Sequence, residues 1–411
     1  MRVTTVFNRV LGLDGTLVAG VVFTGDAAVV TVRRAAKVHR CPCGCRVPGR
    51  YDRSVRRWRH VDACGMKVWL EAEVARIWCP DCERVRTEDV PWARPGARHS
   101  GVFEDTVAWL ATRMDKTSLA QLMRCSWEAV DRIVGRVVVE RLDDSRLNNL
   151  VRIGVDEISY LRGHRYLTVV VDHDSGRVVW VGRGHGVETL EAFYRELGFL
   201  RRKRLRAVTM DASSAYISAT RTMAAQAVIC IDPFHVIKWT NEALDSAFRN
   251  SAIPTLKAQM KQARTNAPWR KARFALRAGR EKLRSEHLKI LKVIRAERTE
   301  LHKVYLLKEE LRDLFQIIDP SQAKAYLHSW VQRAAGCGST AFKVLAQKIV
   351  RHADGIIAAV ELGLSNSRSE GVNTKIRVIQ RRGYGHPKAQ SLATMIYLCC
   401  SGMQLSLPTQ R

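Results

Sequence analysis

The order of strand-like and helix-like segments between residues 151 and 238 most constrains the fold of this chain. Three strand-length runs rich in β-branched residues, RIGVDEIS, HRYLTVVVD and RVVWVGRG, follow one another closely, which predicts an antiparallel meander. Two helical patterns then alternate with the apolar runs RAVTMD and AVICID, and this alternation predicts parallel strands added to the same sheet. We therefore predict a mixed sheet packed against helices, within a multidomain α/β chain.

The segment after this sheet contains no strand pattern. Residues 234–355 are predicted to be helical throughout, and residues 257–303 contain 15 basic residues against four Glu. Over all 411 residues, 68 Lys and Arg exceed 40 Asp and Glu, which gives a net charge of +28. Such a charge indicates a polyanionic partner. No apolar run is long enough for a membrane span, so we expect a cytoplasmic protein without a membrane partner.

Paired cysteines indicate a metal site in the first 95 residues. Cys79 and Cys82 form a CxxC knuckle, and two thiolates in a tight turn can bind one tetrahedral Zn²⁺. Cys41 with Cys43 or Cys45 could complete the four ligands, and the choice between the last two stays open. Cys64 is a further candidate, although it lies far from both cysteine pairs in the sequence and could instead be an ordinary core thiol. One structural zinc ion would supply folding free energy to a module with little apolar material. The alternative is a cluster of reduced thiols packed as small apolar groups.

The same module contains cations suited to nucleic acid. Arg53, Arg56 and Arg57 lie between Tyr51 and Trp58 in the sequence. Guanidinium groups attract phosphates, and flat rings stack on cations. We therefore expect this segment to present both its arginines and its rings on a DNA-facing surface.

A unit of three helices is predicted between Gly101 and about Leu142. Apolar residues recur there at helical spacing, and Ser126 fits the N-cap position of the third helix. The short break before Ser126 is typical of a helix-turn-helix, whose recognition helix enters the major groove of DNA. We predict that Arg132 and Arg136 of this helix face outward and contact DNA.

Three acids suggest the chemistry of the predicted sheet. Asp156 lies in its first strand, Asp211 ends the run AVTM, and Glu370 begins a predicted helix beyond the helical block. An ionised carboxylate on an apolar strand is unfavourable unless it is paired or binds a metal. Two Asp and one Glu suit two-metal phosphoryl transfer, because Mg²⁺ prefers carboxylate oxygens. The alternative is that each carboxylate only caps nearby backbone N–H groups.

Four further residues have candidate roles. Asp232 also closes an apolar strand and competes with Asp211 for the second position. His235 fits either a contact to phosphate or to the acids, or a cap of the next helix. Arg377 would share a helix face with the predicted glutamate and bind phosphate beside the scissile bond. Arg273, in the basic helical block, is expected to contact phosphates of flanking DNA.

Several motifs, in this order, resemble the ISL3 family of insertion-sequence DDE transposases. They are CPCG, YDRSVRRWRHVD, CPDC, RMDKTSLAQLMRCSWEAV, GVDEISYLRGHRYLTVVVDHDSG, VTMDASSAY, IDPFHVIKWTNEALD and SNSRSEGVNTKIRVIQRRGYG. The first motif departs from the family form CPxCG, because one residue is missing between its first two cysteines. The resemblance implies an RNase H-like catalytic domain in which Asp156, Asp211 and Glu370 bind two Mg²⁺ or Mn²⁺ ions.

The resemblance also implies an activity. A transposase of this family is expected to bind the terminal inverted repeats of its element, cut at the ends and join them to target DNA. We expect it to work as a homodimer on double-stranded DNA in the bacterial nucleoid. Two alternatives stay open: a catalytically inactive DNA-binding regulator derived from a transposase, and an RNase H-like nuclease that cuts without joining.

These interpretations divide the chain into five segments. We predict a zinc-binding domain over residues 1–95, a helix-turn-helix domain over 96–148, a first catalytic part over 149–238, a basic helical insertion over 239–355 and a second catalytic part over 356–411.

Overall fold

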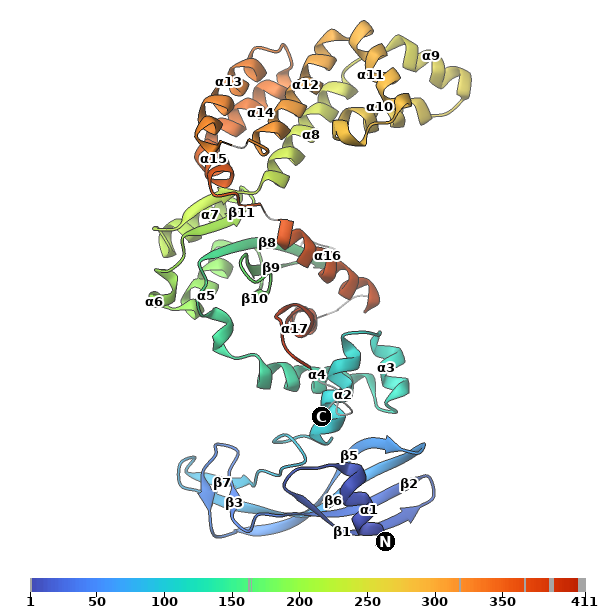
Figure 1. The fold of residues 1–411 in the computed structure, drawn as a ribbon, viewed down its shortest axis with the longest axis vertical. Helices are drawn as coiled ribbons and strands as arrows, with labels where there is room; N and C mark the ends of the chain where they lie inside the picture. Colours follow the sequence, from blue (N-terminus) through green and yellow to red (C-terminus); the bar gives the residue numbers. More distant parts are fainter. Residues whose placement is uncertain are drawn as a thin grey trace. The chain divides into compact units, whose positions relative to one another are not determined.

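The computed structural model describes residues 2–161, 163, 165–317, 319–365, 367–383 and 388–405. The mixed α/β class predicted from the sequence is confirmed, and the chain forms two compact units (Figure 1). Unit 1 comprises Met1–Asp143, Arg381–Tyr384 and Gln390–Arg411, and unit 2 comprises Asp144–Gln380 and Gly385–Ala389. The division into five segments stays a prediction.

Unit 1 begins with a helix and a five-stranded sheet. Helix α1 (Val3–Leu11), which the sequence analysis did not foresee, packs on the first strand. The strand order is β1-β2-β6-β5, with β7 beside β6, and a separate hairpin contains β3 and β4. The strands are β1 (Thr16–Thr24), β2 (Ala27–Arg34), β3 (His39–Arg40), β4 (Arg46–Val47), β5 (Asp52–Ala63), β6 (Met66–Cys79) and β7 (Arg84–Thr87).

The ring of Trp58 in β5 lies in the protein core and not on the surface, where it was predicted. Trp58 is only 5% exposed and packs edge-on against Trp92, so the prediction of a surface ring at this position is wrong. Side chains alternate between the two faces of a strand, and the phase of β5 directs Trp58 into the core. The ring of Tyr51 is exposed, as are the three predicted DNA-facing side chains, Arg53, Arg56 and Arg57.

The predicted trihelical unit is present. It consists of α2 (Gly101–Ala111), α3 (Lys116–Leu122) and α4 (Trp127–Arg141). Ser126 caps α4, because its hydroxyl accepts a hydrogen bond from the backbone N–H of Ala129, as predicted. The apolar face of α4 is buried through Val130, Ile133, Val134 and Val137. Helix α17 (Ala389–Cys400) belongs mostly to the same unit, where its Ser391 accepts from the Lys116 ammonium (3.0 Å).

Unit 2 contains the predicted mixed sheet. Its strand order is β10-β9-β8-β11-β12, with an antiparallel meander from β8 to β10. Strand β11 is parallel to both β8 and β12, as the alternation of strands and helices predicts. The strands are β8 (Arg152–Leu161), β9 (Arg165–Asp172), β10 (Val178–Arg183), β11 (Ala207–Met210) and β12 (Val228–Ile231).

Helices cover this sheet. Phe193 of α5 (Val187–Leu197) and Tyr216 of α7 (Ser214–Met223) are fully buried against strand residues, with the short α6 (Phe199–Arg202) between these helices. Helix α15 (Ala353–Glu361) packs on β12, where a side chain at Gly355 would collide with Ile231. Glycine thus permits the close approach of this helix to the sheet.

The predicted helical block is present between β12 and α15. Its core includes the fully buried Trp330 and Phe342. No helix of the described residues is both long and apolar enough to cross a membrane. The block contains α8 (Pro233–Arg249), α9 (Pro254–Ala263), α10 (Ala267–Arg277), α11 (Ser285–Glu297), α12 (Thr299–Leu314), α13 (Ala323–Ala335) and α14 (Thr340–Arg351), and α16 (Ser367–Arg382) follows α15.

Candidate functional site

The parallel strands of unit 2 bring three aspartates to one edge of the sheet. Asp211 directly follows β11 and Asp232 directly follows β12, and these two strands are paired in register to their last residues. Asp156 lies two residues beyond the last β8 residue that pairs with β11. Because parallel strands advance together, the three aspartates reach the same level of the sheet.

Local hydrogen bonds hold the first two carboxylates. The backbone N–H of Glu157 donates to Asp156 Oδ1 (2.8 Å), and that of Ser213 donates to Asp211 Oδ1 (3.1 Å). Asp156 Oδ2 accepts a further bond from the side-chain amide of Asn373 (2.5 Å). In the described part of the chain, neither aspartate forms an ion pair with a Lys or Arg.

The electrostatic surroundings make this edge unfavourable for negative charge. Burial raises the pKa of Asp156, and the charge of Asp211 raises it further, while hydrogen bonds from Glu157 and Asn373 and the nearby His235 oppose the increase. Burial and Asp211 also raise the pKa of Glu157. Partly buried carboxylates that, among the described residues, form no ion pair with Lys or Arg fit a divalent ion such as Mg²⁺.

Helix α16 lies along β8 and carries the third predicted acid. Its Asn373 contacts Asp156, and its Gln380 donates to the carbonyl of Ser159 (3.1 Å). Seven helical residues and three strand residues each span about 10 Å, so the helix and the strand run side by side. Glu370 is exposed and precedes Asn373 by about one turn, which puts both on the same helix face.

The structure does not bring all three predicted acids together at metal-binding distance. Among the described residues, a group of at least three potential metal ligands within 4.8 Å of one another is formed by cysteines and not by these acids. Asp156 and Asp211 are neighbours on adjacent strands, whereas Glu370 reaches this edge through the helix that contacts Asp156.

Asp232 has a different environment from the other two aspartates. Its side chain is 2% exposed and accepts from the backbone N–H of Phe234 (3.2 Å), so it caps α8. His235 Nε2 lies 3.9 Å from Asp232 Oδ2, and its ring is within electrostatic range of Asp156. The half-buried Asp211 is therefore more accessible to a substrate than Asp232.

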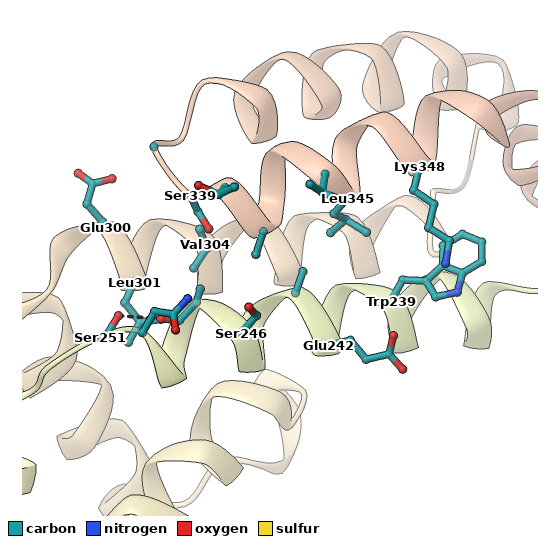
Figure 2. A pocket seen from close by; sticks show the side chains of 17 residues that line it. Trp239, Glu242, Ser246, Ser251, Glu300, Leu301, Val304, Ser339, Leu345 and Lys348 are labelled. Atoms are coloured by element: carbon teal, nitrogen blue, oxygen red, sulfur yellow. Dashed lines mark hydrogen bonds between the residues drawn. The ribbon is translucent and has the colours of Figure 1, made fainter.

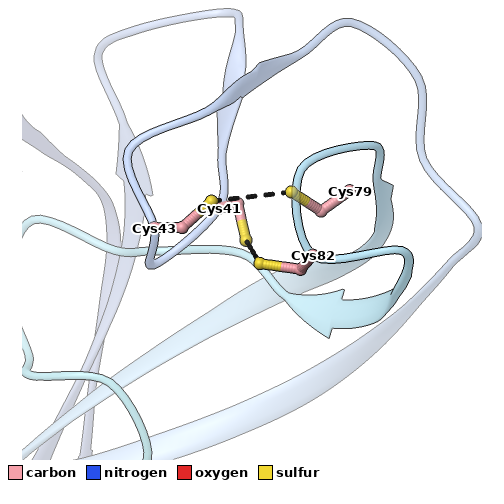
Figure 3. Close-up of side chains that lie close together, drawn as sticks. All are labelled: Cys41, Cys43, Cys79 and Cys82. Carbon is pink, nitrogen blue, oxygen red and sulfur yellow. Dashed lines mark hydrogen bonds between the residues drawn. The ribbon is translucent and has the colours of Figure 1, made fainter.

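The predicted cysteine site is assembled in unit 1. Figure 3 shows Cys41 and Cys43 facing Cys79 and Cys82, and the four sulfurs lie within 4.8 Å of one another. The Cys41–Cys82 and Cys43–Cys79 sulfur distances are 3.9 and 3.6 Å. Tetrahedral Zn²⁺ with Zn–S bonds of about 2.3 Å would require sulfurs about 3.8 Å apart. The two sulfur pairs at 3.9 and 3.6 Å therefore already have the spacing that this ion requires.

The local backbone explains which cysteines meet. The β3–β4 hairpin carries Cys41 and Cys43, whereas Cys79 ends β6 and Cys82 lies in the turn that follows. Cys45 packs beside the cluster, but its sulfur is directed to the carbonyl of Arg46 (3.8 Å). Burial acts to raise the pKa of Cys79, but hydrogen bonds from the backbone of Cys82 and from the other thiols lower it to about 7. One thiolate is thus favoured at neutral pH.

The seven arginines predicted to bind DNA differ in whether they form ion pairs within the protein. Four of them bind carboxylates of the protein: the pairs are Arg53–Glu73, Arg57–Glu71, Arg136–Glu104 and Arg273–Asp245. For the other three, no ion pair is recorded among the described residues: Arg56, Arg132 and Arg377. Arg136 is 31% exposed, and its guanidinium contacts both carboxylate oxygens of the fully buried Glu104, so contact of this residue with DNA stays a prediction.

Sequence reasoning missed the buried cation Arg94. Its side chain is 10% exposed and contacts Glu104 (3.4 Å), Asp105 (2.6 Å) and Glu140 (2.6 Å). A signal for this cluster is present in the sequence, because Glu104 lies at helical spacing from the apolar Ala108 and Ala111. An acid on the buried face of a helix requires a cationic partner.

A cavity of about 630 Å³ lies among α8, α12 and α14 of the helical block. Figure 2 shows Lys348 beside the ring of Trp239, with its Nζ 3.9 Å from the ring centroid. Glu242 and Glu300 also line the cavity, and none of the residues predicted from the sequence does. With two acids and one cation, this cavity does not have the charge expected of a DNA site.

The sequence of this chain is similar to those of known proteins. The sequence model of the DDE domain of family ISL3, described as "Transposase", matches residues 153–396, and the "Helix-turn-helix domain of transposase family ISL3" matches residues 88–138. The chain is 39% identical over 439 residues to the transposase for insertion sequence element IS1557 of Mycobacterium tuberculosis (strain CDC 1551 / Oshkosh), which covers 99% of this chain and 98% of that relative.

A second relative is the transposase for insertion sequence element IS1001 of Bordetella parapertussis. It is 29% identical over 372 residues, which cover 88% of this chain and 89% of the relative. The resemblance inferred from the motifs is confirmed, and so is the helix-turn-helix. A family match over more than half of the sequence, together with near full-length similarity, assigns this chain to the ISL3 family of insertion-sequence transposases.

Proposed function

We propose that this transposase binds the terminal inverted repeats of its own element, cuts at their ends and joins the 3′-OH ends to target DNA. The observation that carries this proposal is the pair of neighbouring aspartates, Asp156 and Asp211, at the edge of the mixed sheet. Their charges are close together, and among the described residues neither forms an ion pair with any of the 68 Lys and Arg. A site that leaves such charges unbalanced is suited to divalent metal ions.

The fold supports an RNase H-like catalytic domain in unit 2. A meander of three antiparallel strands is followed by two parallel strands, and α16 lies along the central strand β8. The proposed insertion between the second and the third acid, residues 239–355, contains most of the helical block that begins with α8. The proposed domain boundaries are those predicted from the sequence.

In this proposal, Asp156, Asp211 and Glu370 hold two Mg²⁺ or Mn²⁺ ions. Bound divalent ions would stabilise the charge on the scissile phosphate and lower the pKa of the attacking water or 3′-OH. The amide of Asn373 orients Asp156, and the N–H of Ser213 orients Asp211. Arg377, exposed on α16, would bind the adjacent phosphate.

Unit 1 would recognise the element ends. We propose one structural Zn²⁺ on Cys41, Cys43, Cys79 and Cys82, which supports the sheet that carries Arg53, Arg56 and Arg57. Arg132 on the exposed face of α4 would contact the major groove. Joining two ends at one target requires two active sites, so we propose a homodimer on DNA in the bacterial nucleoid.

The test is an assay of cleavage and joining with labelled duplexes that carry the ends of the element. Purified full-length protein with Mg²⁺ should cut at the ends and transfer the 3′ ends to a target duplex, and both reactions should stop with a chelator. Binding of the ends without cleavage under any divalent ion would favour the inactive regulator. Cleavage without joining would favour the nuclease.

A further inference from the structure

Two sets of contacts join the N-terminal sheet rigidly to the helix-turn-helix within unit 1. In the first set, the chain between them pairs with β5: the N–H of Arg59 donates to the Arg98 carbonyl (3.0 Å), and the N–H of Ser100 donates to the Arg59 carbonyl (2.9 Å). The sheet and the helices are therefore connected without a flexible linker.

The second set holds the turn that precedes the recognition helix α4. Arg124, with φ of 50°, adopts the left-handed conformation in this turn. Its guanidinium donates to Asp62 Oδ2 (3.1 Å) and to the Gly65 carbonyl (3.0 Å) at the end of the β5–β6 hairpin. An arginine rarely adopts this backbone conformation, and these two contacts stabilise it.

A groove of about 770 Å³ lies between the two walls that these contacts hold together. Strands β5 and β6 form one wall, and the start of α4 forms the other, through Ser126, Ala129 and Arg132. These three residues are spaced by three positions, so they share one face of the helix. In helix-turn-helix proteins, residues near the start of the recognition helix contact the edges of the bases.

The charge in this groove is entirely positive. No acid is among its lining residues, and six of its cations are Arg56, Arg57, Lys67, Arg98, Arg124 and Arg132. Arg57, Lys67 and Arg124 form ion pairs with carboxylates outside the lining. For Arg56, Arg98 and Arg132, no ion pair is recorded in the described ranges, and all three side chains are exposed.

The histidine between the two walls provides a further polar group. His99 lines the groove, and its ring stacks on Phe103 at 4.8 Å between centroids. Its buried Nδ1 has no hydrogen-bond partner among the described residues. A partner from outside the protein, such as a phosphate oxygen or a bridging water, would satisfy this atom.

We propose that this groove is a single composite binding site for double-stranded DNA, in which β5 and α4 contact the same DNA at the same time. The proposal rests on the proposed function, in which unit 1 binds DNA, and adds that the two modules contact one continuous segment. Arg98, which lies before the first helix of the helix-turn-helix, would bind a phosphate between the contacts of Arg56 and Arg132. The unpaired guanidinium groups supply the attraction, and the fixed walls set the distance between the contacts.

The test compares Arg98→Ala and Arg132→Ala with Arg33→Ala in the full-length protein. Arg33 is exposed on β2 and does not line the groove, so its variant controls for the loss of one positive charge. Binding is measured on duplexes with the element end and on random duplexes of equal length. We expect Arg98→Ala and Arg132→Ala each to bind about tenfold more weakly than the wild type to any duplex that the wild type binds. The affinity of Arg33→Ala should decrease less than twofold.

Ethylation and methylation interference then locate the contacts. The phosphates whose ethylation interference disappears in Arg98→Ala and the bases whose methylation interference disappears in Arg132→Ala should lie within one turn of the duplex, about 10 base pairs. Contacts separated by more than one turn, or an Arg98→Ala variant that behaves like the control, would overturn the composite site. If the wild type bound the element-end duplex and the random duplex equally well, recognition of the element ends in the proposed function would be overturned. The comparison of the groove variants with the control would still test the composite site. Failure to bind either duplex would overturn both.

Discussion

The acids around Arg94 in unit 1 and the acids at the sheet edge in unit 2 have opposite surroundings. Glu104 and Asp105 are 0% and 5% exposed, and each contacts two arginines. Asp156 and Asp211 are half-buried, and among the described residues neither has an ion pair with Lys or Arg. Burial raises the pKa of both Glu104 and Asp156. Two arginines oppose the increase at Glu104, whereas hydrogen bonds from Glu157 and Asn373 and the nearby His235 oppose it at Asp156.

This difference bears on function, because the chain has an excess of cations. With 68 Lys and Arg against 40 Asp and Glu, a fold that needs to neutralise an acid has many cations available. It does so at Glu104, where neutralisation stabilises the packing of helices. At Asp156 and Asp211 it does not, which supports the proposal that the compensating cation comes from solution.

The largest expected effect concerns the four thiols, for which no ion pair with a cation of the protein is recorded among the described residues. Removing zinc with a strong chelator, or replacing Cys79 or Cys82 by Ser, should unfold the N-terminal sheet, because structural zinc contributes about 10 kcal/mol to folding. Circular dichroism and metal analysis of the full-length protein provide the measurement. Cys64→Ser, at an exposed residue outside the cluster, is the control.

Zinc should also be lost as the pH falls, because protons compete with the metal for the thiolates. The stability of unit 1 would then decrease toward acid. Reduced, well-folded protein without any zinc would contradict the proposal.

The second expected effect concerns the uncompensated acids. Asp156→Ala, Asp211→Ala and Glu370→Ala should each lower the rate of cleavage by about 10³-fold, or about 4 kcal/mol, because a metal ligand is lost. Binding to element ends should stay nearly unchanged in gel-shift assays of the same preparations. The control is Asp232→Ser, which retains an oxygen to cap α8. If Asp232→Ser abolishes cleavage and Asp211→Ala does not, the assignment of the second acid is wrong.

The third expected effect concerns the compensated acids. Arg94→Ala should lower the free energy of unfolding of unit 1 by about 3 kcal/mol at neutral pH, because it leaves buried carboxylates without their partner. Those carboxylates bind protons more readily in the variant, so the loss should shrink as the pH falls. Thermal unfolding at several pH values measures this effect. Arg53→Ala breaks the exposed pair with Glu73 and should change stability by less than about 1 kcal/mol.

The smallest expected effect has the opposite sign. Asp156→Asn should raise the free energy of unfolding of metal-free protein by about 1 kcal/mol, because it removes a partly buried charge beside Asp211. The folded protein raises the pKa of Asp156, so ionisation of this group reduces stability as the pH rises above about 4, the ordinary value of Asp. The gain should therefore be present at neutral pH and disappear below about pH 4.

Addition of Mg²⁺ provides the control for this last prediction. It should raise the melting temperature of the wild type and have a smaller effect on Asp156→Asn, because the variant lacks one ligand. A variant that is less stable than wild type at neutral pH without metal would show that the charge of Asp156 is already compensated within the protein.

Several features of the site could be predicted from the sequence because they depend on neighbouring residues. Ser126 caps α4 because a hydroxyl three residues before Ala129 reaches its N–H. The CxxC spacing lets the tight turn at the end of β6 bring the thiols of Cys79 and Cys82 close together. The positions of Asp156 and Asp211 at the ends of apolar runs follow from the same local patterns, while their selection as catalytic acids came from the resemblance to a family.

Other features could not be predicted because they join distant segments. Arg132 and Arg136 lie one turn apart on α4, yet Arg132 is exposed and Arg136 binds a buried acid of α2. The choice between Cys43 and Cys45 as the fourth sulfur depends on how the β3–β4 hairpin meets the turn after β6. Neither sequence spacing nor composition contains this information, because equivalent side chains differ only in their tertiary neighbours.

The sequence by itself thus determined the mixed sheet, the capped helices, the cysteine pairs, the excess of positive charge and, through its motifs, the family. The tertiary structure alone decided which of the 68 cations bind the protein's own acids and which remain available to a ligand. The physical reason is the range of the interactions. Helix caps, turns and strand patterns depend on residues a few positions apart, whereas burial and ion pairing depend on which surfaces meet when the chain folds.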